Sequence, residues 1–352
     1  MAQTLSPALT AKTNRSKVRI PARVYHDAED VARSLNPEQP LFLFSEQNLE
    51  ERLGRFEAGF PGRVSYAVKA NSRPEVIRAA SKAGLRLYDV ASTVEMAGVR
   101  REAPFARFNY HNPVKSRDEI ITALDTFGVK RFAVDDRNEI EKVFSCALGR
   151  IAAEDLEIAV RFRLPKHGVS AHDFSSKFGV TPEAAVLLLK DVVARGAKPV
   201  LTFHPGSQCA DPSAFVRYIE AAAAISRVAG IPLHVLNVGG GFPSRYPRAD
   251  APELEDFFAA IAAARTACFP ANDQPELECE PGRGLVATSA SLLTKVKLRR
   301  ADVDEIFLND GIYGGLMEGY QVPSLSPAFR AFRADGTPMT GEMKPFTVFG
   351  PT

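Results

Sequence analysis

An apolar segment that ends in a lysine, Val64-Ser-Tyr-Ala-Val-Lys-Ala-Asn71, carries the clearest chemical potential in the sequence. Val64, Tyr66 and Val68 alternate with small residues, as in a short buried strand, and Lys69 stands at its end. Lysine is rarely buried without a partner, and an amine with a lowered pKa is a good nucleophile toward an aldehyde. Taken alone, the segment leaves open a lysine that simply reaches solvent at a strand end.

Further polar residues stand at the ends of other predicted strands. They are Asp89, Arg161 or Arg163, His204, the run Gly239-Gly240-Gly241, and Glu280 with Arg283. Each has a simpler structural explanation when it is taken alone: a helix cap for Asp89, a core histidine for His204 and a tight turn for the glycines. With Lys69, six such positions at the same end of successive strands are much harder to explain in this way, so we expect them to gather at one mouth.

Together these residues meet the needs of one cofactor. A glycine run lets backbone N–H groups approach a phosphate, with Arg283 adding charge and Ser207 a hydroxyl. Lys69 offers an amine for an aldehyde, Glu280 an acid that can hold a proton on a ring nitrogen, and His204 a flat face for stacking. A phosphate, an aldehyde and a protonated pyridine describe pyridoxal 5′-phosphate.

The elements that must position these residues follow a repeating order of short apolar strand, polar turn and amphipathic helix. Eight strands are expected near residues 64–69, 87–91, 106–110, 131–134, 157–163, 199–204, 235–238 and 276–280. Helices are expected at about 74–84, 93–101, 115–127, 137–149, 181–195, 213–229 and 252–268. Strands that alternate with helices favour a parallel sheet, and eight units favour an α/β fold with a closed (β/α)8 barrel. A doubly wound open sheet is the alternative.

The segments on either side of the barrel differ from it. We assign residues 1–39 to an N-terminal tail, 40–284 to the barrel, and 285–352 to a partial, mostly β domain. The strand near 41–44 could join that domain from the other end of the chain, and Ser45 is the expected cap of a helix over about 46–58. The first 26 residues contain no Asp or Glu, a feature that is also found in transit peptides. Because these residues show no clear amphipathic period, we favour a frayed polar tail.

The composition excludes several classes of function. With 45% apolar and 24% charged residues, the chain is typical of a soluble globular protein. A net charge of +2 gives no broad basic surface, so no nucleic-acid partner is expected. The four cysteines have no paired spacing, which argues against a disulfide framework and a zinc site and suits a reducing, cytoplasmic compartment. No apolar run approaches the length of a membrane span.

The lysine segment Ser65-Tyr-Ala-Val-Lys-Ala-Asn71 resembles the cofactor motif of the barrel-type pyridoxal-phosphate enzymes, which include alanine racemase and several amino-acid decarboxylases. Six other motifs resemble the ornithine/lysine/arginine decarboxylase branch, ornithine decarboxylase above all. They are Asp89-Val-Ala-Ser92, Ser176-Lys-Phe-Gly179, Phe203-His-Pro-Gly-Ser-Gln-Cys209, Gly239-Gly-Gly-Phe-Pro243, Glu280-Pro-Gly-Arg283 and Asn309-Asp-Gly-Ile-Tyr-Gly314. The resemblance extends from about residue 40 to the last residue.

The resemblance implies a role for each motif residue. Lys69 would carry the cofactor, His204 would stack on its pyridine ring, and Glu280 would pair with the ring nitrogen. Asp89 would lie near Lys69 and tune it, and Arg161 would support His204 from the next strand. The phosphate would be surrounded by Ser207, Gly240, Gly241 and Arg283.

The substrate-reading region resembles the family less closely. Tyr313 would lie near cofactor or substrate, and Glu318 is the acid that could replace the family's aspartate facing the distal amine. The family is homodimeric with active sites at the subunit interface, and its members continue after Gly-Pro-Thr with a Cys-Asp pair that serves the catalytic site. This sequence stops at Thr352, before that pair.

The sequence therefore predicts a pyridoxal-phosphate decarboxylase that converts a basic amino acid, ornithine first and lysine second, to a diamine such as putrescine for polyamine biosynthesis. A racemase or a decarboxylase of another amino acid on the same fold is one alternative. A non-catalytic relative that regulates a true decarboxylase is another, which the missing Cys-Asp pair favours and the set of Lys69, His204 and Glu280 opposes. A truncated piece of an ordinary enzyme is a third.

Overall fold

The computed structural model describes residues 24–165, 177–247, 251–322, 325, 328–341 and 344–351. Most of the expected tail, Ser176 of one family motif and Thr352 lie outside these residues. Within the described parts of the chain, no helix is both long enough and apolar enough to cross a membrane.

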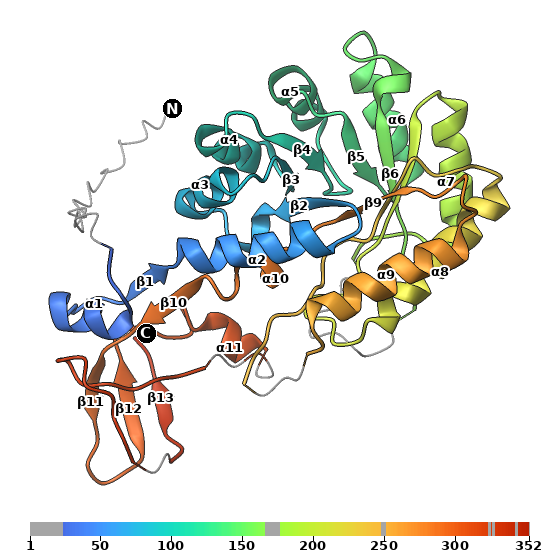
Figure 1. The fold of residues 1–352 in the computed structure, drawn as a ribbon. Coiled ribbons are helices and arrows are strands. Elements are labelled where there is room, and N and C mark those ends of the chain that lie inside the picture. Colours follow the sequence, from blue (N-terminus) through green and yellow to red (C-terminus); the bar gives the residue numbers. More distant parts are fainter. Residues whose placement is uncertain are drawn as a thin grey trace, which may run out of the picture. The chain divides into compact units, whose positions relative to one another are not determined.

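Eight parallel strands pair in sequence order and close into a barrel, which confirms the expected fold over the open sheet (Figure 1). The strands are β2 (Arg63–Ala67), β3 (Leu87–Val90), β4 (Arg107–Tyr110), β5 (Arg131–Val134), β6 (Glu157–Arg161), β7 (Lys198–Thr202), β8 (Val235–Asn237) and β9 (Glu276–Cys279). The circle closes where β2 pairs with β9, through Arg63 opposite Glu278 and Val64 opposite Cys279. The carboxyl ends of all eight strands consequently meet at one mouth.

Helices lie outside the strands, and short polar side chains start several of them. The helices are α2 (Glu46–Gly59), α3 (Pro74–Lys82), α4 (Thr93–Glu102), α5 (Arg117–Phe127), α6 (Arg137–Ala147), α7 (Pro182–Ala194), α8 (Ser213–Ala229) and α9 (Leu254–Cys268). Ser45, Ser92, Ser116 and Thr181 cap α2, α4, α5 and α7, each accepting a hydrogen bond from the N–H three residues later. Because Ser92 caps α4, the simpler explanation of Asp89 as the cap of that helix is wrong.

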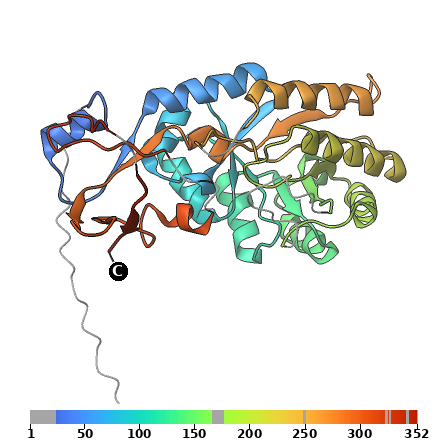
Figure 2. The ribbon, with the colours of Figure 1, turned by 90° about the horizontal axis from the view of Figure 1, so that it is seen from below.

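The helices α2 and α9 lie next to each other, although they are far apart in the sequence (Figure 2). A cluster of aromatic side chains packs them together. The ring of Phe56 on α2 lies 5.4 Å from that of Phe258 on α9 and 5.4 Å from that of Phe242. Phe242 stacks in turn on Phe215 of α8 at 5.0 Å. These fully or almost fully buried rings hold the outer helices against the barrel wall.

Two smaller sheets lie outside the barrel. The strand β1 (Leu41–Phe44) pairs antiparallel with β10 (Ala290–Leu293). The strands β11 (Val296–Arg299), β12 (Glu305–Leu308) and β13 (Thr347–Phe349) form a second sheet, antiparallel between β11 and β12 and parallel between β12 and β13. Two short helices, α10 (Arg283–Val286) and α11 (Met317–Gln321), complete this region.

A separate compact unit combines part of the predicted tail with a later segment. Residues 28–35 form helix α1 (Ala28–Leu35), which Asp27 caps. In this unit Arg33 on α1 donates a hydrogen bond to the backbone oxygen of Asp335 at 2.9 Å.

Candidate active site

Lys69 lies in a short 3-10 helix, η1 (Val68–Ala70), immediately after β2. The strand is shorter than expected because the chain turns at Val68, where the Asn71 N–H donates to the Val68 oxygen at 3.1 Å. The Lys69 side chain is 61% exposed and its Nζ lies 3.9 Å from Oδ2 of Asp89. Of the two possibilities that the segment left open, the structure shows the lysine that reaches solvent, and the amine is open to a ligand that enters the mouth.

A small cavity lies at the carboxyl ends of the strands. It is lined by Lys69, Asp89, His111, Arg161, Thr202, Phe203, His204 and Glu280. The structure thus brings together one side chain from each of several predicted strand ends, as expected for a barrel mouth. Ser207, Gly240, Gly241, Arg283, Tyr313 and Glu318 are not among the lining residues.

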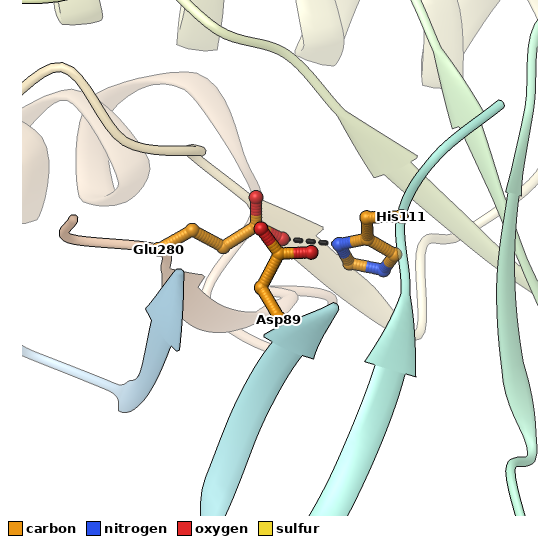
Figure 3. Close-up of side chains that lie close together, drawn as sticks. All are labelled: Asp89, His111 and Glu280. Atoms are coloured by element: carbon orange, nitrogen blue, oxygen red, sulfur yellow. Dashed lines mark hydrogen bonds and ion pairs between the residues drawn. The ribbon is translucent and has the colours of Figure 1, made fainter. Parts of the chain in front are cut away.

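Asp89, His111 and Glu280 converge inside the cavity, with potential ligand atoms all within 4.8 Å of one another (Figure 3). Nδ1 of His111 is hydrogen-bonded to Oε1 of Glu280, across 169 residues of sequence. The amide of Asn237 donates to the same oxygen at 2.6 Å. Sequence reasoning missed His111, although it follows the strand β4 just as Asp89 stands near the end of β3.

The three groups shift one another's pKa values. Burial and the charge of Glu280 raise the pKa of Asp89. Burial also acts to raise the pKa of Glu280. The charge and hydrogen bond of His111, the charge of Lys69 and the hydrogen bond from Asn237 outweigh burial and hold the pKa of Glu280 below its usual range. Burial opposes the charge of His111, yet Glu280 raises the pKa of this imidazole above its ordinary value. Glu280 therefore stays ionised, as an acid must be to keep a proton on a pyridine nitrogen.

His204 presents a neutral ring to the cavity. Burial, followed by the positive charges of Arg161 and Lys69, lowers the pKa of His204 to about 3. Its Nδ1 accepts a hydrogen bond from the Gly206 N–H at 3.0 Å, which assigns the proton of the neutral ring to Nε2. Arg161 stands at the end of β6 with its guanidinium 5.2 Å from the ring centre of Phe178. An uncharged imidazole fixed by its backbone is suited to stacking on an aromatic ligand.

The glycine run packs so tightly that side chains cannot be added to it. A Cβ on Gly240 would lie 2.6 Å from the backbone oxygen of Glu280 and 3.3 Å from Nε2 of His204. Gly241 has a φ of +95°, which favours glycine, and a Cβ there would collide with the backbone of Gly206. The run is thus a tight turn that needs glycine because it packs closely against the backbone near Glu280 and Gly206.

Gln208 fixes the loop that carries Ser207 against the loop after the glycine run. The Ser244 N–H donates to the Gln208 side-chain oxygen at 3.0 Å, and the Gln208 amide donates back to the Ser244 oxygen. Gln208 adopts a φ of 56°, an uncommon conformation for a residue other than glycine. Such strain is typical of a site whose geometry must be held.

Arg283 and Glu318 bind each other. The Arg283 guanidinium donates to both carboxylate oxygens of Glu318, at 2.9 Å for Oε2, and to the Tyr246 hydroxyl at 2.6 Å. Tyr313 is 84% exposed. The structure thus joins one predicted phosphate residue to one predicted substrate residue beside the mouth, and the roles of both stay predictions.

The arrangement fits pyridoxal 5′-phosphate. An accessible amine, an ionised buried acid and a neutral imidazole face one cavity, and the glycine turn supplies a bare backbone of the kind that approaches a phosphate. Lys69, Glu280 and His204 are the residues that could hold its aldehyde, ring nitrogen and ring face.

Known proteins resemble the chain over most of its length. The model of the family described as pyridoxal-dependent decarboxylase, pyridoxal binding domain, matches residues 46–287. The lysine/ornithine decarboxylase of Selenomonas ruminantium is 30% identical over 283 residues, which cover 78% of this chain and 69% of that protein.

Solved structures resemble it as well. An SrLDC variant solved in complex with PLP has a TM-score of 0.78 at 26% identity and covers 94% of this chain and 83% of its own. The lysine/ornithine decarboxylase of Vibrio vulnificus, complexed with cadaverine, has a TM-score of 0.75 at 26% identity, covering 94% and 86%.

Proposed function

Because the chain belongs to the pyridoxal-dependent decarboxylase family, we propose that it removes the α-carboxyl group of a basic amino acid, ornithine first and lysine second, to give a diamine. The observation that carries the proposal is the convergence of Lys69, His204 and Glu280 on one cavity. The choice of substrate is supported by the relative described as a lysine/ornithine decarboxylase and by the neighbour solved with cadaverine. The product of ornithine would be putrescine, which feeds polyamine biosynthesis.

Each side chain has a distinct task in this reaction. Bound pyridoxal phosphate supplies the electron sink for the electron pair that remains when CO₂ departs. Lys69 would hold the aldehyde carbon of the cofactor, and Asp89, whose Oδ2 lies 3.9 Å from Nζ, would stabilise a positive charge on this nitrogen. Glu280 would hold a proton on the ring nitrogen, and the neutral ring of His204 would pack against the aromatic ring.

The phosphate contacts are proposed for the backbone of Gly240 and Gly241, the hydroxyl of Ser207 and the guanidinium of Arg283. The bare glycine backbone supports this assignment. Arg161 would hold His204 in its neutral form, since its positive charge disfavours a second cation nearby.

The test is release of CO₂ from carboxyl-labelled ornithine and lysine by the chain with added pyridoxal phosphate. The products are identified by chromatography as putrescine or cadaverine, and chiral analysis of the remaining amino acid detects racemisation. Lys69→Ala is the matched control, which we expect to lose both turnover and the visible absorption band of the lysine-bound cofactor. Unchanged CO₂ release by this variant would refute the assignment, and racemised substrate without CO₂ would favour the racemase.

Glu318 is the acid that we propose for the distal amine of the substrate, with Tyr313 on the same segment. The ion pair with Arg283 supports this, since it shows the carboxylate within reach of a residue expected at the phosphate. Glu318→Gln should raise the KM for ornithine and leave the Kd for pyridoxal phosphate unchanged. If the substitution changes only the affinity for the cofactor, Glu318 positions Arg283 and does not contact the substrate.

We also propose that the active form is a homodimer, as the family resemblance implies. Large apolar side chains on the segment around α11 support this, since Met317 is 51% and Tyr320 70% exposed. Sedimentation equilibrium of the chain with and without pyridoxal phosphate tests the proposal, and a monomer at every concentration would contradict it.

A further inference from the structure

We propose that His111 is a positioning residue that fixes the carboxylate of Glu280 so that one of its oxygens stays available to the cofactor ring nitrogen. The inference rests on the function proposed above and deepens it. Nothing in the motifs of the sequence points to this histidine, and the argument comes from the contacts around the two side chains.

The two oxygens of Glu280 have different surroundings. Oε1 is hydrogen-bonded by Nδ1 of His111 and by the amide of Asn237, the latter at 2.6 Å. Among the described residues, Oε2 takes part in no hydrogen bond. A carboxylate with two donors on one oxygen cannot rotate freely, so its other oxygen keeps a fixed direction.

The backbones that carry both side chains are fixed as well. The His111 N–H donates to the oxygen of Val90 on β3 at 3.2 Å, and the Glu280 N–H donates to the oxygen of Gly239 at 2.7 Å. The side chains of His111 and Glu280 are only 5% and 10% exposed. Their contact therefore joins the ends of two strands that are not neighbours, β4 and β9, in a place that water barely reaches.

Asn237 alone could not replace His111. The Asn237 amide also donates to Oε1 of Glu278 at 2.9 Å, so its position depends on the carboxylates of both Glu278 and Glu280. Glu278 is held by Arg131 at 2.8 Å on both oxygens, deep in the barrel. Without His111, Glu280 would depend on this single shared amide.

The charges around the imidazole favour its role. Three acids surround the imidazole of His111: Glu278 on β9, Glu280 just after β9, and Asp89 on β3. Two cations, Lys69 on η1 and Arg161 on β6, interact with Glu280 and Asp89. The imidazolium stabilises the ionised form of Glu280 and so keeps this acid from drawing the ring proton onto itself. Nε2 of His111 is buried and has no hydrogen-bond partner in the described chain, so the contact with Glu280 is the one that orients the ring.

Two substitutions separate the contact from the charge. His111→Asn keeps an N–H donor at a similar reach but cannot be charged, whereas His111→Leu removes both. His234→Asn is the matched control, because this histidine is 41% exposed and lies before β8, outside the cavity. Circular dichroism and thermal unfolding confirm that each variant is folded.

The first readout is the Kd of the apo-protein for pyridoxal 5′-phosphate, measured by absorbance titration, which does not depend on turnover. We expect about a tenfold weaker Kd for His111→Leu, by analogy with supporting residues behind other cofactor ligands, and a smaller loss for His111→Asn. The second readout is the split between kcat and KM for ornithine, where His111→Leu should lower kcat and leave KM within about threefold. The control should match the wild type in both.

A His111→Leu protein that is folded and binds the cofactor within twofold of the wild type would overturn the inference. Equal losses in the Asn and Leu variants would overturn the part that assigns the effect to a retained donor. A wild type that binds the cofactor but releases no CO₂ from ornithine or lysine would refute the proposed function instead, and the titration would still decide the role of His111.

Discussion

Glu278 is fully buried inside the barrel, and its removal should be the most costly single change in this network. Its carboxylate accepts hydrogen bonds from Arg131 at 2.8 Å on both oxygens, from Asn109 at 2.6 Å and from Asn237 at 2.9 Å. Glu278→Leu would leave Arg131, which is 5% exposed at its side chain, with only Glu157 as a partner. Breaking a buried ion pair by removing one partner costs about 3–5 kcal/mol.

This free energy can be converted to a melting temperature. An unfolding entropy of about 2.1 cal/mol/K per residue, applied to 352 residues, gives about 1.4 °C for each kcal/mol. Glu278→Leu should therefore lower Tm by roughly 4–7 °C. Scanning calorimetry of the apo-protein at pH 7 measures the shift, and chemical denaturation checks the free energy independently.

The same strand offers the control. Glu276 lies two residues before Glu278 and pairs with Arg63 at 3.0 Å, but its side chain is 46% exposed. Glu276→Gln should cost less than about 1 kcal/mol, because exposed ion pairs contribute little. The double variant Arg131→Met with Glu278→Leu should recover part of the loss, since it also removes the buried guanidinium, and the acid that then loses Arg131 is Glu157, which is 18% exposed. Equal Tm shifts for Glu276→Gln and Glu278→Leu would refute this reasoning.

Two further changes test the glycine turn and a buried lysine. Gly240→Ala should cost about 1–3 kcal/mol in unfolding free energy, because its Cβ would lie 2.6 Å from the Glu280 backbone oxygen. The control Gly54→Ala in α2, where a Cβ would meet nothing within 4 Å, should stabilise the protein slightly. Denaturation midpoints that fall equally in the two variants would contradict this. Burial lowers the pKa of Lys115 to about 8, below its ordinary value of 10.5, so the unfolded chain binds more protons between these values and stability should rise with pH across them. The Lys115→Met variant should lack this rise. Unfolding midpoints of the wild type and the variant are measured from pH 7.5 to 10.5, and identical dependence on pH in both proteins would show that the Lys115 amine does not titrate in this range.

The architecture could be predicted because each element carries its own signal. Short apolar strands alternate with helices that begin at residues such as Ser92 and Thr181, and both helices start at these caps. Lys69, His204 and Glu280 stood out because their chemistry is unusual at the end of an apolar strand, and the closed barrel brings them together. The sequence left the exposure of Lys69 open, because it did not show that the strand ends at Ala67 and that the lysine lies in the turn beyond it.

The network behind the site could not be predicted, because its signal resembles that of an ordinary strand. Glu276, Glu278 and Glu280 alternate with apolar residues, a pattern that usually indicates a solvent-facing side. In a closed barrel the corresponding side faces the interior, and only Glu276, at the start of β9, is exposed. Whether an acid can be accepted there depends on cations from distant strands, which no local pattern reveals.

Each of the two buried acids, Glu278 on β9 and Glu280 just after it, has its own positively charged partner in the barrel interior. Arg131 neutralises Glu278 in the middle of the barrel, and His111 neutralises Glu280 at the mouth. Asn237 connects the two acids without adding charge. Because Arg131 and Arg63 offset the charge of Glu278 within the barrel, the carboxylate of Glu280 responds mainly to the groups in the cavity. An acid that must remain ionised beside Asp89 and still accept a hydrogen bond from a ligand needs this separation, since a second uncompensated carboxylate beneath it would raise its pKa and favour its protonated form.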